Sequence, residues 1–399
     1  MKIVLTGCTG TVGRELVPQL ILAGAELLLV GRDPEHIRAI FPGIESASYD
    51  EISKKGFGYD LIAHLATLNN NAGLPLEEFY RINVDHALYV FETAKLAQIK
   101  RIVYFSSFHA LDGNNNSAYA ASKREAEKRF GQSGINAVIL YLPMVYGRQW
   151  YGKLSILNGL PKIVSTSIFY VVAAFKPVVR SRKISDFLMA GAPSSEFNRS
   201  FLYDDKSENV VYGVTKRLLD LVFAFSITVV FWWLLTGIWF AIRVQSRGPG
   251  VFAQVRIGEH GKSFVCFKFR TMVAETKQSG TREISSSSVT ALGRILRHAK
   301  LDELPQILNI FRNEMTLVGP RPCLPVQDDL INKRKESGVF SVKPGITGYA
   351  QINNIDMSDP ALLNEYDMRY KAMRSILLDT KILLCTFLGG GRGDRVGRS

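Results

Sequence analysis

An uncharged apolar segment in the middle of the chain limits its possible folds most. Residues 221–242, LVFAFSITVVFWWLLTGIWFAI, contain no Asp, Glu, Lys or Arg. A helix of this length can cross a bilayer core of roughly 30 Å. A helix in the core of a water-soluble domain would normally carry a polar stripe along one side. The segment therefore predicts a membrane-embedded helix, which we place at residues 216–245.

The residues that flank this segment are basic on both sides. Lys216 and Arg217 precede it, and Arg243 and Arg247 follow it. Because Lys and Arg favour the cytoplasmic face of a membrane, flanks of the same sign suit a helix that enters and leaves by one face. A spanning helix stays open as the alternative.

The whole chain is basic, with 49 Lys and Arg against 36 Asp and Glu and a net charge of +13. Most of the excess follows Gly213, so this half should meet phospholipid, a phosphorylated substrate or nucleic acid. Nucleic acid is the weakest of the three. No nucleic-acid-binding fold is recognisable, and the aromatic residues gather in the apolar segment instead of among the basic ones.

The length of 399 residues predicts two domains, each able to bury its own core. We place an α/β domain at residues 1–205 and a linker, polar at its start, at 206–215. A second, mainly α domain follows the membrane helix at residues 246–399.

Three glycines near the start predict a dinucleotide site. Gly7, Gly10 and Gly13 lie between a β-rich run and a helical pattern, where glycine lets a pyrophosphate approach the backbone at a helix N-terminus. Arg32 follows the next strand, at the place where an acidic residue often binds the ribose of NAD. Arginine there favours the 2′-phosphate, so NADP is preferred to NAD.

Alternating strand and helix patterns continue to about residue 205 and predict a Rossmann-like, doubly wound parallel sheet. Within them Tyr119 and Lys123 are spaced by one helical turn and follow Ser107. These residues, with the glycines, resemble the extended short-chain dehydrogenase/reductases, the NAD-dependent epimerase/dehydratase family. The resemblance implies that Tyr119 transfers a proton, that Lys123 lowers its pKa, and that Ser107 orients the substrate. An alignment from Gly113 would instead put Phe108 in the serine position.

The first domain is open to a second interpretation. The part expected to bind substrate, after residue 150, is short, and so is the loop between Ser107 and Tyr119. The domain is therefore either an NADP-dependent reductase or epimerase of a UDP-sugar, or a non-catalytic nucleotide-binding or regulatory module.

Two adjacent carboxylates, Asp302 and Glu303, stand out in the second half. They precede Pro305, which is tolerated in a first helical turn, so capping of a helix is the simplest explanation. However, Arg297 and Arg321 lie near enough to bracket a phosphate beside them. A carboxylate near arginines stays ionised and can act as a nucleophile or metal ligand.

A basic amphipathic helix is expected at residues 291–300, just before this pair. Its apolar residues Leu292, Ile295 and Leu296 fall on one side. Such a helix favours an anionic membrane surface.

From residue 216 to 388 the chain resembles the bacterial sugar transferases, the monotopic phosphoglycosyl transferases. The blocks that carry the resemblance are KRLLD, GPGVFAQVRIG, FKFRTM, LDELPQ, VGPRP and PGITGYAQIN. The resemblance implies that Asp302 attacks a UDP-sugar, releasing UMP and forming a phosphosugar on the enzyme. Glu303 would then assist attack by polyprenyl (undecaprenyl) phosphate. Mg²⁺ would be bound at Asp302.

The same resemblance implies further partners and positions. Arg297 and Arg321 would bind phosphate, and the remaining nucleotide-binding positions would be Lys268, Arg270, Thr271, Pro344, Gly345, Thr347 and Gly348. Both domains would face the cytoplasm at the bacterial inner membrane, and a homodimer is an open alternative. Relatives break their re-entrant helix at a Ser-Pro pair. This chain has Trp232 and Trp233 there, so we expect a bend at Thr236–Gly237.

Overall fold

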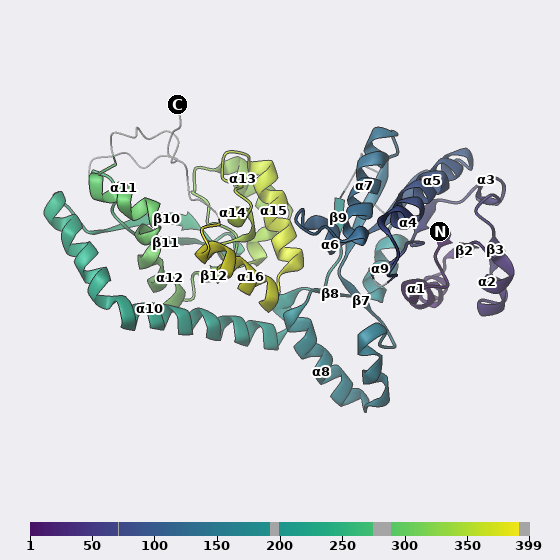
Figure 1. Cartoon of the computed structure of the whole chain (residues 1–399), viewed down its shortest axis with the longest axis horizontal. Helices are drawn as coiled ribbons and strands as arrows, with labels where there is room; N and C mark the ends of the chain where they lie inside the picture. Colours follow the sequence, from purple (N-terminus) through teal and green to yellow (C-terminus); the bar gives the residue numbers. More distant parts are fainter. Residues whose placement is uncertain (71, 192–198, 274–288, 391–399) are drawn as a thin grey trace. The chain divides into compact units, whose positions relative to one another are not determined.

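The computed structural model describes the chain apart from residues 71, 192–198, 274–288 and 391–399. The chain forms two compact units (Figure 1). The first comprises Met1–Phe169 and Pro177–Asp205, and the second comprises Tyr170–Lys176 and Lys206–Ser399. Each unit is described by itself.

The first unit is built on a seven-stranded parallel sheet in its described residues, with strand order β3-β2-β1-β4-β5-β6-β9. The strand order reverses between β1 and β4, as in a doubly wound dinucleotide fold. This confirms the predicted fold class. The strands are β1 (Lys2–Thr6), β2 (Glu26–Val30), β3 (Glu45–Ala47), β4 (Leu61–His64), β5 (Arg101–Ser107), β6 (Ala137–Leu142) and β9 (Arg199–Phe201).

The central strands are apolar and buried on both faces, which is the pattern of a parallel sheet covered by helices. Every residue of β4 and β6 is buried. A separate parallel pair consists of β7 (Met144–Tyr146) and β8 (Val178–Arg180). The helices are α1 (Thr11–Leu22), α2 (Pro34–Ile40), α3 (Ile52–Lys55), α4 (Leu76–Tyr80), the π-helical Arg81–Asp85, α5 (His86–Leu96), α6 (Phe108–Leu111), α7 (Ala118–Gln132), the 3₁₀ segment Gly152–Gly159, α8 (Lys162–Phe175) and α9 (Ser181–Met189).

In the second unit a long helix runs along one side of shorter helices and two small sheets (Figure 1). Strands β10 and β11 form an antiparallel hairpin, and β12 pairs with β13 in parallel. Its α-helices and strands are α10 (Val210–Gln245), β10 (Val251–Ile257), β11 (Ser263–Phe269), α11 (Ala291–His298), α12 (Ile307–Phe311), β12 (Thr316–Val318), α13 (Asp328–Glu336), β13 (Gly345–Thr347), α14 (Tyr349–Ile352), α15 (Pro360–Met373) and α16 (Ile376–Phe387). Its 3₁₀ segments are η3 (Lys206–Glu208), η4 (Glu259–Gly261), η6 (Leu301–Gln306) and η7 (Val339–Ser341).

Helix α10 begins earlier than the sequence suggested. We expected a linker at residues 206–215, but η3 and the first turns of α10 occupy it. The side chain of Asn209 accepts a hydrogen bond from Tyr212 N at 2.9 Å and caps the helix. This cap fixes the start of α10, because it satisfies a backbone donor that has no partner within the helix.

Helix α10 is long and apolar enough to cross a membrane, and it is bent (Figure 1). Its backbone leaves helical values at Phe231 (φ −112°, ψ 16°). The Trp233 indole donates to the Val230 carbonyl at 3.1 Å beside this bend, adding a partner for a carbonyl at the irregular turn. The bend therefore lies at Phe231 and not at Thr236–Gly237, where we expected it.

Helix α11 forms where the sequence predicted an amphipathic helix, but only part of its apolar side is covered. Leu296 is buried in a cluster with Ile238 and Phe269. In contrast, Ile295 is 64% exposed. Leu292, Ile295 and Leu296 thus share one side of α11 as predicted, but only Leu296 and part of Leu292 are covered and Ile295 stays exposed.

The glycine turn after β1 leaves no room for side chains. Gly7 has φ +69°, and a Cβ there would lie 2.7 Å from Ala66 N. At Gly13 an added Cβ would lie 2.4 Å from the Gly7 carbonyl oxygen. The glycines are therefore needed to pack the turn, in agreement with the close approach expected of a dinucleotide fold.

Gly13→Ala should lower the free energy of unfolding by about 1–3 kcal/mol, because the backbone must shift to admit a methyl group. The matched control is Gly131→Ala in α7, where an added Cβ meets no atom within 4 Å. That change should stabilise the protein by about 0.5–1 kcal/mol. Denaturant unfolding of detergent-solubilised protein measures both, and equal stabilities would contradict the packing argument.

Candidate active site

The second unit holds a cluster of opposite charges around Glu303. Its Oε1 lies 2.8 Å from Lys268 Nζ on β11 and 3.2 Å from Arg321 Nη2, which follows β12. Both carboxylates sit in η6, which begins after Lys300, a residue held at φ 55°. The blocks FKFRTM, LDELPQ and VGPRP are thus brought together by tertiary contacts.

The two neighbouring carboxylates are in very different electrostatic environments. Burial, and then the charge of Glu303, raise the pKa of Asp302 to about 6. Burial would also raise the pKa of Glu303, but Lys268 and Arg321 lower it to about 2. We expected a carboxylate near the arginines to stay ionised; this holds for Glu303, which pairs with Lys268 and Arg321, whereas the pKa of Asp302 is raised. Environments that separate two carboxyl pKa values this far give the two groups different chemistry.

Arg297 approaches the pair from α11. Its Nε donates to Thr271 Oγ1 at 2.9 Å, which fixes the guanidinium. The charges of Arg297 and Arg321 both lower the pKa of Asp302, although less than burial raises it. Both arginines therefore act electrostatically on Asp302, and the bracketing of a phosphate by them stays a prediction.

A small pocket opens beside these groups. Its walls include Lys268, Glu303 and Arg321, together with Gly345 of the PGITG block. It also contains Arg256, which the sequence analysis did not single out, although it lies in the block GPGVFAQVRIG. Three cationic side chains in one pocket suit an anionic ligand such as a phosphate.

The PGITG block has a packing role. A Cβ on Gly345 would lie 2.0 Å from Gly319 N, and one on Gly348 would lie 2.3 Å from the Gly319 carbonyl oxygen. Gly345 N donates to the Pro320 carbonyl at 3.0 Å, and Pro344 has no amide hydrogen. These glycines let the block pack against VGPRP, so a nucleotide contact by Pro344, Gly345, Thr347 and Gly348 stays a prediction.

Asn309, a residue that the sequence analysis missed, connects two elements that carry site residues. Its Nδ2 donates to the Val265 carbonyl at 2.6 Å, and its Oδ1 accepts from Phe267 N at 3.1 Å. Asn309 is fully buried, so it joins α12 to β11 and holds Lys268 at the level of Glu303. In the sequence, the only signal of this role was a polar Asn within the apolar run ILNIF.

Arg270, expected in the same pocket, lies elsewhere. Its guanidinium donates to the carbonyls of Ser246 at 2.8 Å and Arg247 at 3.0 Å. It therefore satisfies carbonyls at the C-terminal end of α10. The strand pattern does not explain the difference, because Arg270 follows β11 and is two residues from Lys268, a spacing that would put both on one face of a continued strand.

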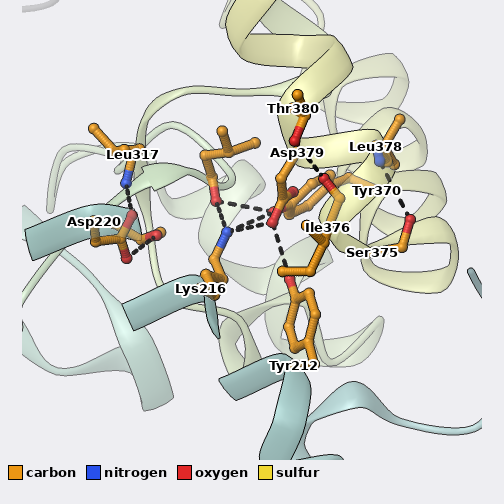
Figure 2. A network of polar contacts seen from close by, with 12 residues as sticks. Tyr212, Lys216, Asp220, Leu317, Tyr370, Ser375, Ile376, Leu378, Asp379 and Thr380 are labelled. Carbon is orange, nitrogen blue, oxygen red and sulfur yellow. Dashed lines mark hydrogen bonds and ion pairs between the residues drawn. The ribbon is translucent and has the colours of Figure 1, made fainter. Parts of the chain in front are cut away.

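Helix α10 is fixed to the rest of this unit by a buried polar network (Figure 2). Lys216 Nζ lies 2.7 Å from Asp379 Oδ2 on α16 and donates to the Val318 carbonyl of β12 at 2.9 Å. The hydroxyls of Tyr212 and Tyr370 donate to the same carboxylate. The block KRLLD thus fastens α10 to α16 and to the strand that leads to Arg321.

The other charged residues of KRLLD extend this attachment. Asp220 accepts from Thr316 Oγ1 at 2.7 Å and from Leu317 N at 2.8 Å (Figure 2). Arg217 Nη1 donates to the Ile310 carbonyl at the end of α12 at 2.8 Å. The flanking charges that suggested membrane orientation therefore also have structural partners.

In the first unit, Ser107, Tyr119 and Lys123 come together as predicted. Ser107 and Tyr119 are hydrogen-bonded, and Lys123 Nζ lies 5.9 Å from the centre of the Tyr119 ring. Ser106 instead donates to buried Glu127 at 2.7 Å, and Phe108 is buried. The geometry therefore favours Ser107 over its neighbours.

The predicted lowering of the Tyr119 pKa is not found. Burial raises the pKa of Tyr119, and the hydrogen bond with Ser107 opposes this only in part. Burial also lowers the pKa of Lys123 to about 7, against the charge of Glu127. Its Nζ donates to the Phe105 carbonyl at 2.7 Å. A lysine with this pKa supplies less positive charge to Tyr119 than we expected.

Comparisons with known proteins agree with this division into two units. Residues 211–391 match the bacterial sugar transferase family, and residues 3–205 match the NAD dependent epimerase/dehydratase family. The chain therefore belongs to the bacterial sugar transferase family in its second half and to the NAD dependent epimerase/dehydratase family in its first. It joins units of two enzyme families in one chain.

Two relatives and one solved structure illustrate these similarities. The uncharacterized sugar transferase EpsL of Bacillus subtilis is 38% identical over 174 residues, which cover 43% of this chain and 85% of EpsL. Undecaprenyl-phosphate glucose phosphotransferase of Komagataeibacter xylinus is 32% identical over 278 residues, covering 65% of this chain and 49% of that one. The chain thus spans about half of the latter relative. The crystal structure of UDP-N-acetylglucosamine 4-epimerase from Bacillus cereus has 16% identity and a TM-score of 0.39, covering 51% of this chain and 78% of that one.

Asp379→Asn should lower the free energy of unfolding by about 3–5 kcal/mol, because it leaves the Lys216 charge buried without its counterion. The control is Asp329→Asn, which breaks an exposed ion pair with Lys333 on α13 and should cost less than about 1 kcal/mol. Denaturant unfolding in detergent compares the two. A loss at Asp379 no larger than the loss at Asp329 would show that the network does not hold α10.

Proposed function

We propose that the second unit transfers a sugar 1-phosphate from a UDP-sugar to polyprenyl phosphate, undecaprenyl phosphate in bacteria. The product would start assembly of a glycan such as O-antigen, capsule or exopolysaccharide. The observation that carries the proposal is the Asp302–Glu303 pair. Glu303 forms ion pairs with two cations, Lys268 and Arg321, whereas the ion pairs of the described residues include none with Asp302. The printed activities of the relatives support the substrate classes.

The proposed reaction has two displacements at one phosphorus. An Asp302 oxygen attacks the phosphate that bears the sugar, and the bond to UMP breaks, leaving a phosphosugar ester on Asp302. An oxygen of polyprenyl phosphate then attacks the same phosphorus. This step restores the Asp302 carboxylate and gives polyprenyl diphosphate sugar.

Glu303 has a different part in this proposal from the one suggested by the sequence. A carboxylate with a pKa of about 2 is a weak base at neutral pH. Instead it would hold Lys268 and Arg321 at the distances at which their charges bind the diphosphate. Arg297 would contribute a further positive charge near the nucleophile.

The donor set at this site suits Mg²⁺. The described residues contain no group of three or more His, Cys, Asp and Glu that could hold a metal by themselves. Mg²⁺ usually keeps several waters and binds through one or two carboxylates plus substrate phosphates. Asp302 would supply the carboxylate, and the ion would offset the charge of the diphosphate and of departing UMP.

For the first unit we propose binding of a nicotinamide cofactor at the turn of Gly7, Gly10 and Gly13. Arg32 would favour NADP over NAD. With Ser107, Tyr119 and Lys123, this unit would act as a reductase or epimerase of the UDP-sugar. The raised pKa of Tyr119 keeps open the alternative that it is a non-catalytic nucleotide-binding or regulatory module.

We also propose that α10 embeds the chain in the bacterial inner membrane, with the site on the cytoplasmic face. The bend at Phe231 supports a helix that enters and leaves by the same face. The extended apolar surface of α10 supports contact with lipid.

Asp302→Asn should reduce UMP release by about 10³-fold or more, because an amide cannot replace the carboxylate as nucleophile. The assay contains detergent-solubilised protein, Mg²⁺, undecaprenyl phosphate and a panel of UDP-sugars, ketosugars included. Asp328→Asn, on the surface helix α13, is the control and should leave the rate unchanged. Wild-type protein that releases no UMP from any sugar would overturn the proposed transferase.

Tyr119→Phe separates the two interpretations of the first unit. If this unit is a reductase, the variant should lose NADPH-dependent reduction of a UDP-ketosugar by about 10²-fold or more, because the proton donor is gone. UMP release from an already reduced UDP-sugar should not change. Equal reduction by wild type and variant, or no reduction by either, would favour the binding module.

A further inference from the structure

Helix α8 has an apolar side that the described residues leave uncovered. Ile163 and Tyr170 are 83% and 52% exposed. Four further exposed apolar residues recur at helical spacing and are 38–47% exposed: Val164, Ile168, Val171 and Phe175. Residues at this spacing lie along one side of a helix. The buried residues of α8 lie on another side: Ser165, Phe169, Ala173 and Ala174.

The length and composition of α8 suit the surface of a bilayer. From Ile163 to Phe175 the sequence contains no charged residue. An apolar run of this length is too short to span a membrane and is typical of a core helix or an interfacial segment. The exposure of its apolar side argues against the core helix.

The last turn of α8 is fixed to the start of α10 within the second unit. Lys206 is buried, and its Nζ donates to the carbonyls of Ala173 and, at 2.7 Å, of Lys176. Asn209, the residue that caps α10, donates to the Tyr170 carbonyl at 3.0 Å. These contacts place the end of α8 beside the first turn of α10 (Figure 1).

This attachment keeps α8 close to the point where α10 would enter the lipid. The uncharged part of α10 begins at Leu221, only about three helical turns after its first residue, Val210. Within the second unit, the last turn of α8 therefore lies beside the part of α10 that leads into the proposed membrane contact.

The charges around α8 favour an anionic surface. Lys162 and Lys176 flank the apolar run and are exposed. No acidic residue occurs in the sequence between Glu127 and Asp186. Basic residues beside an apolar helical side attract anionic phospholipid headgroups.

We propose that α8 is a second membrane contact, a helix that lies along the bilayer surface with its Val164–Phe175 side in the lipid and its two lysines among anionic headgroups. The inference rests on the proposed membrane placement of α10. It adds that the connection between the two units touches the same bilayer.

The test places a fluorescent probe on α8 in the full-length protein. Val171→Cys, in a Cys385→Ser background that keeps only the buried native cysteines, is labelled with a nitrobenzoxadiazole dye. The protein is reconstituted in nanodiscs of phosphatidylcholine and phosphatidylglycerol. A nitroxide on the lipid chain near the headgroup should remove most of the emission, and aqueous iodide should remove little.

Two further positions calibrate the result. Leu96→Cys on α5 starts from a residue that is 75% exposed and should be quenched by iodide but not by the lipid nitroxide. Val229→Cys on α10 should be quenched by lipid. The inference about α8 is wrong if the probe at Val229 is quenched by lipid while the probe at Val171 behaves like the one at Leu96. It is also wrong if neither quencher reaches Val171, because protein then covers this side of α8. In both cases α10 stays in the membrane. If lipid fails to quench Val229 as well, the membrane placement of α10 fails and the inference fails with it.

Discussion

The contacts of Glu303 with Lys268 and Arg321 determine the character of the site in the second unit. They join β11, η6 and the residues after β12, three segments distant in sequence. They also separate the two neighbouring carboxyl groups electrostatically, because one is surrounded by cations and the other is raised in pKa by burial. Without this pairing, the repulsion between two adjacent carboxylates would still raise the pKa of one of them, but no cations would hold the other ionised.

The residues of KRLLD connect helix α10 to the strand that precedes the site. Lys216 and Asp220 both contact β12, and β12 leads directly to Arg321. Lys216 and Asp220 therefore link α10 to the segment that carries Arg321, one of the residues that pair with Glu303. On the proposed mechanism this link matters, because the acceptor phosphate arrives from the bilayer while the UDP-sugar arrives from water.

Local signals in the sequence were sufficient for the fold class and for the long apolar helix. The uncharged segment at 221–242 depends on neighbouring residues alone, whereas the turn at Gly7 also packs against Ala66, which follows β4. The bend at Phe231 could not be predicted, because no proline or glycine marks that position. The role of Asn309 and the separated carboxyl pKa values also needed the fold, because burial and long-range charges produce them. The sequence was enough to single out Asp302, Glu303 and Arg321 as site residues, but not to predict which of them form ion pairs.

The most direct test of the proposed two-step chemistry is to trap the intermediate. Protein in detergent is mixed with Mg²⁺ and a UDP-sugar radiolabelled in the sugar, without polyprenyl phosphate, and digested after denaturation. The account predicts about one label per chain, on the peptide that contains Asp302 and removable by hydroxylamine, with an equal amount of UMP. UMP formed only when both substrates are present, with no label on the protein at any time, would contradict it and indicate direct transfer.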